Sequence, residues 1–98
     1  MFKRPIFKNF APAFDLEISV STLLSDLLDF APYGSEMSSS IERAGRRYFC
    51  RVGISSQAGR FETRVQGSSA RLAAKKAQKM LWKQLMKWHE RRELAAAV

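Results

Sequence analysis

The segment from residue 48 to residue 92 constrains the fold most strongly, because two alternating segments precede one long basic helix. Residues 48–54 and 60–65 alternate apolar and polar side chains. This period of two is typical of antiparallel strands that bury one face and expose the other. Residues 67–69 (Gly-Ser-Ser) then open a run of alanine and lysine without proline or glycine. We therefore predict a hairpin and a helix from near Ser69 or Ala70 to about Arg92.

The spacing of apolar residues in this last helix predicts which side packs on the sheet. Positions that recur near the helical period of 3.6 residues form the predicted inward stripe, and small residues at its start allow close approach to the sheet. The stripe consists of Ala73, Ala77, either Met80 or Leu81, Leu85 and Trp88. The other faces carry Arg71, Lys75, Lys76, Lys79, Lys83 and Lys87.

The first half of the chain has weaker patterns. Leucines at 23, 24, 27 and 28 predict a helix over about residues 20–30, which Pro32 ends. Residues 37–41 alternate weakly and indicate a first strand. Residues 14–20 also alternate, which fits either an extra strand or an extended lead-in to the helix. Residues 1–13 contain two prolines among aromatic residues, which indicates an irregular arm.

These elements predict an α+β domain with the order α-β-β-β-α. A three-stranded antiparallel sheet would pack on two helices, with an N-terminal arm in front. The predicted division is an arm at residues 1–17, a domain at 18–92 and a short tail at 93–98. A chain of 98 residues supports one modest core, and its ends favour a complete small protein or an N-terminal domain.

The charge of the chain is unevenly distributed. Residues 43–98 contain fourteen Lys or Arg and three acids, a net charge of +11, whereas residues 1–42 have a net charge of −3. A basic excess in one half favours a polyanion as partner. Arg71 and Lys75 lie one turn apart at the start of the last helix, with Ser69 as its cap. Phosphate contact suits such a helix start.

Other classes of function have little support. The one cysteine, Cys50, lies on the apolar side of a predicted strand, so we expect a buried thiol and no disulfide within the chain. We expect the one histidine, His89, to face solvent, and the sequence has neither a Cys/His cluster nor a Gly-rich phosphate loop. We therefore expect no enzyme, catalytic residue, metal, cofactor or small-molecule substrate. The apolar runs are far shorter than the roughly twenty residues of a membrane span, so we expect no membrane partner.

The predicted order of elements resembles the double-stranded-RNA-binding domain family. The resemblance covers about residues 18–88 and depends on the aromatic-x-Cys-x-Val-x-Ile pattern at 48–54 and the Gly-x-Ser at 67–69. It implies a fold that lies along A-form RNA and contacts two minor grooves and the phosphates between them.

The resemblance also implies three contact regions. Asp26 takes the place of the family's usual glutamate on the first helix. The loop at 43–47 lacks the family's proline and histidine, and Ala70 and Ala74 replace two lysines of the last helix. The implied RNA-binding residues are Thr22, Ser25, Asp26, Arg43, Arg46, Arg47, Ser69, Arg71, Lys75, Lys76 and Lys79.

We therefore predict non-catalytic binding of double-stranded RNA by shape and phosphate contacts, in an intracellular protein of the cytoplasm or nucleus. The alternative is a protein-interaction or homodimerisation module of the same fold with little affinity for RNA. The altered lysine motif and several aromatic residues favour this alternative. Its candidate partner-binding residues are Phe7, Phe10, Phe14, Trp82 and Met86.

Overall fold

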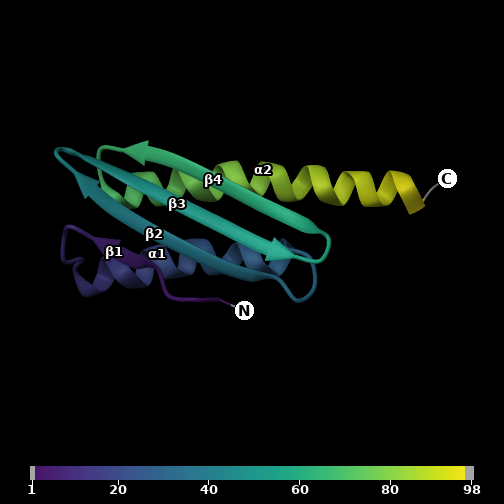
Figure 1. Ribbon diagram of the computed structural model, residues 1–98, viewed down its shortest axis with the longest axis horizontal. Coiled ribbons are helices and arrows are strands. Elements are labelled where there is room, and N and C mark those ends of the chain that lie inside the picture. The colour runs from purple at the N-terminus through teal and green to yellow at the C-terminus, as the bar shows by residue number, and fades with distance from the viewer. Residues whose placement is uncertain (1, 97–98) are drawn as a thin grey trace.

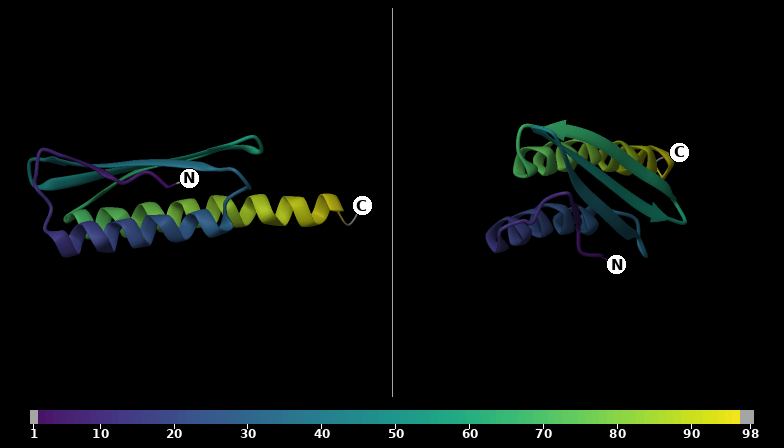
Figure 2. Two further views of the ribbon diagram at one scale, coloured as in Figure 1. Left: turned by 90° about the horizontal axis from the view of Figure 1, so that it is seen from below. Right: turned by 60° about the vertical axis from the view of Figure 1, so that its left-hand side comes forward.

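The computed structural model describes residues 2–96, with side chains as far as Arg92. Two helices cover one face of a sheet, and the other face is open (Figures 1 and 2). The elements are β1 (Ile6–Lys8), α1 (Phe14–Ser25), the 3-10 helix η1 (Asp26–Phe30), β2 (Glu36–Ala44), β3 (Arg47–Ser56), β4 (Gly59–Gly67) and α2 (Ala70–Ala96).

The sheet has four strands in the order β1-β2-β3-β4. β1 runs parallel to β2, and the other two pairs are antiparallel. The α+β class is confirmed, as are two helices. The predicted three-stranded antiparallel sheet is wrong, because part of the expected arm forms a fourth strand. The division into arm, domain and tail stays a prediction, and its first boundary falls within α1.

β1 joins the sheet through both backbone and aromatic contacts. Phe7 pairs with Ile41 of β2, and its ring meets that of Phe10 edge to face, which in turn meets Tyr48. The strand ends at Lys8. The next residue, Asn9, has a left-handed φ of 64°, a conformation that asparagine tolerates better than most residues. α1 then provides the crossover that a parallel pair needs.

α1 begins at Phe14, about six residues before the predicted start. Residues 14–20 are therefore neither a strand nor an extended lead-in. The reason is that Val20 and Leu24 share one buried face at a spacing of four, and Leu16 lies one turn earlier. Phe14 and Ile18 are exposed on another side, and these outward apolar residues produce the alternation seen in the sequence.

The core lies between the sheet and the helices. Alanines in the first two turns of α2 let this helix approach β4 closely: a Cβ added at Gly67 would lie 2.8 Å from the Ala73 backbone nitrogen. Farther along α2, Leu81 is fully buried whereas Met80 is 44% exposed, so Leu81 belongs to the inward stripe. The molecule measures 50 × 21 × 18 Å because α2 extends beyond the sheet (Figure 1). Within the described residues, each helix is too short or too polar to cross a membrane.

Candidate functional site

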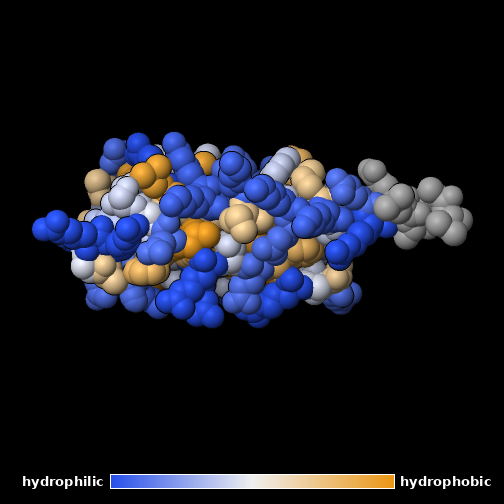
Figure 3. All heavy atoms as spheres, turned by 90° about the horizontal axis from the view of Figure 1, so that it is seen from above, coloured by the Kyte–Doolittle hydropathy of each residue, from blue (hydrophilic) through white to orange (hydrophobic). Residues whose placement is uncertain are grey.

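A row of cations follows the exposed side of α2 at every fourth residue. All five side chains are exposed. Successive members rise by about 6 Å and turn by about 40° around the helix axis, so the row winds around α2. Its last two members, Lys87 and Arg91, lie beside Arg60 and Phe61 of β4. Hydrophilic side chains cover most of the edge that β4 and α2 form, with small separate hydrophobic patches (Figure 3). The α2 row consists of Lys75, Lys79, Lys83, Lys87 and Arg91.

Two neighbours of the row have different roles. Lys76 donates from Nζ to the carbonyl oxygen of Gln66 at 3.1 Å, so it ties the helix to the outer edge of β4. Arg71 contacts Ser19 of α1 with a nitrogen–oxygen distance of 3.5 Å. At the helix start, Ser69 Oγ accepts from the Leu72 backbone N–H at 3.2 Å, as expected of a capping serine.

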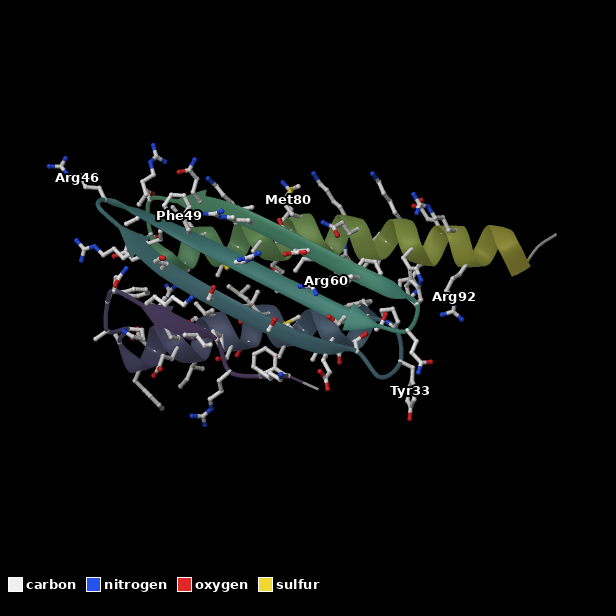
Figure 4. All side chains as sticks on the ribbon, in the orientation of Figure 1. Tyr33, Arg46, Phe49, Arg60, Met80 and Arg92 are labelled. Atoms are coloured by element: carbon white, nitrogen blue, oxygen red, sulfur yellow. The ribbon has the colours of Figure 1, made fainter. Side chains whose placement is uncertain are left out.

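The arginines of the turn at residues 43–47 lie at the same end of the molecule as the start of α2. Tyr48, which follows this turn, pairs with Gly67, which precedes α2. Arg46 projects from the tip of the turn (Figure 4), and Arg43 Nε donates to the Gly45 carbonyl at 3.2 Å. The structure therefore brings the predicted turn cluster next to the first cations of the helix.

The residues predicted on the first helix lie elsewhere. Ser25 donates from Oγ to the Thr22 carbonyl at 3.2 Å, and Asp26 begins η1. Thr22 lines a groove beside the N-terminal segment together with Phe14 and Ile18. This group is separate from the cations of the turn, and its predicted RNA contact stays untested.

The candidate partner-binding residues are spread over the molecule. Phe7 and Phe10 are half-buried against the core, whereas Phe14 is 76% exposed. Trp82 packs edge to face on Phe30 with ring centroids 4.3 Å apart. Met86 is half-buried on α2. They do not form one continuous surface, and their role in partner binding remains a prediction.

The two candidate reactive side chains have structural contacts. Burial raises the pKa of the Cys50 thiol to about 12, which keeps it protonated. His89 was expected to face solvent, but it is half-buried and its Nε2 lies 2.7 Å from the Phe30 carbonyl oxygen. Among the described residues, no group of three or more His, Cys, Asp or Glu could hold a metal ion.

Sequence reasoning missed part of the basic surface. The α2 row continues past the predicted site to Lys83, Lys87 and Arg91, and its spacing of four is visible in the sequence. Arg51 and Arg60 also lie on the open face of the sheet, which the alternation of the two strands could have indicated.

Comparisons with known proteins define the fold. The Thermus thermophilus protein Y N-terminal domain is similar over 90% of this chain and 99% of its own, with a TM-score of 0.76 and 13% identity. A ribosomal subunit interface protein from Coxiella burnetii covers 92% of this chain and 99% of its own, with a TM-score of 0.75 and 10% identity. No protein-family profile and no curated protein sequence matches this chain.

These structures belong to a different fold family from the double-stranded-RNA-binding domain. The suspected resemblance is therefore wrong, because it omitted the strand before α1. The prediction of double-stranded RNA as primary partner is overturned with it. The alternative, an interaction or dimerisation module of that same fold, has no support either. At 10–13% identity the likeness establishes the fold alone.

Proposed function

We propose that this chain is a non-catalytic ribosome-binding protein that attaches to a ribosomal subunit through the basic side of α2. The observation that carries the proposal is the α2 row, on a fold shared with a protein described as a ribosomal subunit interface protein. The exposed surface of a ribosomal subunit is rich in RNA phosphates, which attract such a row of cations.

The geometry of the row supports this partner. Its five members span about 24 Å along the helix axis. Like charges four residues apart repel each other by about 0.2–0.5 kcal/mol per pair. Lysines repeated at this spacing are therefore unfavourable for the free protein. An array of phosphates beside the helix would turn this repulsion into attraction.

The arginines of the turn at 43–47 extend the basic surface at one end of the molecule. Because this turn adjoins the start of α2, one polyanionic surface could contact both. Binding to a ribosomal subunit would also locate the protein in the cytoplasm.

Co-sedimentation with purified ribosomal subunits tests the proposal. The wild-type chain should migrate with one subunit at low salt and be released as the salt concentration rises. Lys79→Gln with Lys83→Gln should weaken this association and reduce the slope of log affinity against log salt concentration by roughly 1.5. Both side chains are exposed, so these substitutions should leave the fold intact.

Lys3→Gln with Arg4→Gln is the matched control, because it removes the same charge from exposed positions outside α2. If both double variants lose affinity equally, net charge and not the α2 row controls binding. If the wild-type chain binds neither subunit at low salt, the proposed function is wrong.

A further inference from the structure

The open face of the sheet contains a hollow of about 300 Å³ over its central strands. Its floor consists of Ser38 and Ser40 of β2 and Gly53 of β3, and these three residues have small side chains or none. Arg51 and Arg60 stand beside them. Figure 4 shows Arg60 over the middle of this face. Both helices pack on the other face, so the hollow is separate from the α2 row.

Gly53 gives the hollow its depth. It lies in the middle of β3 and pairs with Ser38 on one side and Glu62 on the other, without a bulge. The φ angle of Gly53 is not positive, so the backbone conformation does not require glycine here. A glycine inside a regular strand often marks a close approach by a ligand or another group. In this protein the Arg60 guanidinium approaches Gly53. A Cβ added at Gly53 would lie 3.5 Å from Arg60 Nη2.

One carboxylate holds both guanidinium groups in place. Arg51 Nη2 lies 3.5 Å from Glu62 Oε1, and Arg60 Nε lies 3.3 Å from Glu62 Oε2. A single negative charge balances only one of the two arginines. Lys8 also lines the hollow. The lining residues therefore carry three positive charges and one negative charge, a net charge of +2. Several guanidinium N–H groups remain available for another anion.

We propose that this hollow binds a phosphate group. Arg51 and Arg60 would donate charge-assisted hydrogen bonds to its oxygens, and the hydroxyls of Ser38 and Ser40 would donate from the floor. Phosphate suits the site because it accepts hydrogen bonds from several directions at once. The hollow is larger than a single phosphate, so it can also admit the attached sugar of a nucleotide or of an RNA strand.

A two-dimensional NMR titration tests the proposal with three ligands. They are inorganic phosphate, a nucleoside 5′-monophosphate, and a single-stranded oligonucleotide that has backbone phosphodiesters but no terminal phosphate. Saturable shifts of the Ser38, Ser40 and Gly53 amide signals are expected. Preference for the first two ligands would identify a free phosphate group, and preference for the oligonucleotide would identify a backbone phosphodiester. If these three signals do not saturate with any of the ligands, the proposal is wrong.

Arg60→Gln and Arg64→Gln form a matched pair on β4. Both side chains are exposed on the same face, but Arg64 lies over Phe49 and does not line the hollow. Arg60→Gln should weaken phosphate binding roughly tenfold, and Arg64→Gln should leave it within about twofold. Equal effects would show a general charge effect and overturn the proposal.

Gly53→Val tests the shape of the site without changing its charge. Its side chain would occupy the part of the hollow above Gly53, next to the side chains of Arg60 and Ser38, and valine favours strands. Loss of phosphate binding in a folded variant is expected. Binding with wild-type affinity would place the phosphate elsewhere and contradict the proposal. These measurements use no ribosome, so their failure is distinct from failure of the proposed function.

Discussion

Gln84 of α2 hydrogen-bonds to both backbone groups of Glu62 on the outer edge of β4. Its Nε2 donates to the Glu62 carbonyl at 2.9 Å, and its Oε1 accepts from the Glu62 N–H at 3.3 Å. The side-chain amide thus takes the position of a neighbouring strand. Exposed strand edges promote pairing between molecules, so α2 protects this edge as well as covering the sheet.

Gln84→Met should lower the free energy of unfolding by about 1–2 kcal/mol, because the Glu62 backbone groups lose their partners. Denaturant unfolding followed by circular dichroism measures this. The variant should also aggregate faster, since more of the β4 edge is free to pair. Lys83→Met, at the preceding exposed position, is the control. It should not lower the free energy of unfolding, because it breaks no hydrogen bond to β4 and removes two repulsive pairs of the α2 row. Equal losses in the two variants would contradict the role of Gln84.

Two strand glycines should respond in opposite ways to substitution by alanine. At Gly67 the new Cβ would meet the backbone nitrogen of Ala73 at 2.8 Å, and backbone atoms cannot move aside easily. We expect Gly67→Ala to cost about 1–3 kcal/mol of stability. At Gly53 the Cβ has ordinary contacts, so Gly53→Ala should stabilise the protein by about 0.5–1 kcal/mol. Thermal unfolding of both variants measures the difference, and the same sign of change in both would refute this prediction.

Ser39 points into the core with an unfavourable polar group. Its side chain is buried on the same face of β2 as Met37 and Ile41, and its Oγ finds no hydrogen-bond partner among the residues that the structure describes. Ser39→Ala should therefore raise the free energy of unfolding by about 1 kcal/mol. Ser38→Ala on the exposed face is the control, and its effect should be within about 0.5 kcal/mol. A destabilised Ser39→Ala would reveal a partner for this hydroxyl.

Cys50 should make the protein sensitive to alkaline pH. The thiol has its ordinary pKa of 9.0 in the unfolded chain, and burial raises it to about 12 in the folded state. The folded state therefore holds more protons between these values, so stability should fall as pH rises from about 9 to 12. The loss should be on the order of 2 kcal/mol at pH 10.5.

Cys50→Ala is the control, because the other alkaline titrations are common to both proteins and cancel in the difference. Denaturant unfolding at pH 7, 9 and 10.5 gives the change in the free energy of unfolding with pH for the wild type and for Cys50→Ala. Identical pH dependence of the wild type and the variant would show that the thiol ionises freely in the folded state. In addition, a thiol reagent at pH 8 should modify Cys50 only after the protein unfolds.

The sequence predicts elements well where one pattern continues over many residues. β3, β4 and α2 lie close to the predicted ranges because alternation or helical spacing persists through them. β1 has only three residues, and its partner in the sheet is more than thirty residues away. Such a short strand carries no periodic pattern of its own. Its parallel pairing with β2 comes from tertiary contacts, chiefly the burial of Phe7 against the core.

Some features of the basic surface can also be predicted from the sequence, and others cannot. The cations of α2 are evident from the sequence, as is their spacing of four. Which sheet face carries Arg51 and Arg60 also follows from alternation with Cys50 and Phe61, which are buried. The sequence also predicts a sheet that packs on two helices and exposes its other face, and the hollow beside Gly53 lies on that open face. What the sequence does not show is β1, which adds Lys8 to the lining of the hollow.

The α2 row should reduce the stability of the free protein while it promotes binding. Lys79 and Lys83 lie one turn apart, and the row continues at the same spacing in both directions. Lys79→Gln with Lys83→Gln removes three repulsive pairs, which should stabilise the free protein by about 0.5–1.5 kcal/mol at low salt. At 1 M salt the Debye length is only about 3 Å, so repulsion between exposed lysines is largely screened. The gain in stability should therefore largely disappear near 1 M salt. Thermal unfolding at 20 mM and 1 M salt measures both values.

The same variant should bind ribosomal subunits more weakly, so a gain in stability together with a loss of affinity is expected. A variant that is less stable than the wild type at low salt would show that these lysines contribute packing by their aliphatic stems, and that repulsion along the row is too weak to matter.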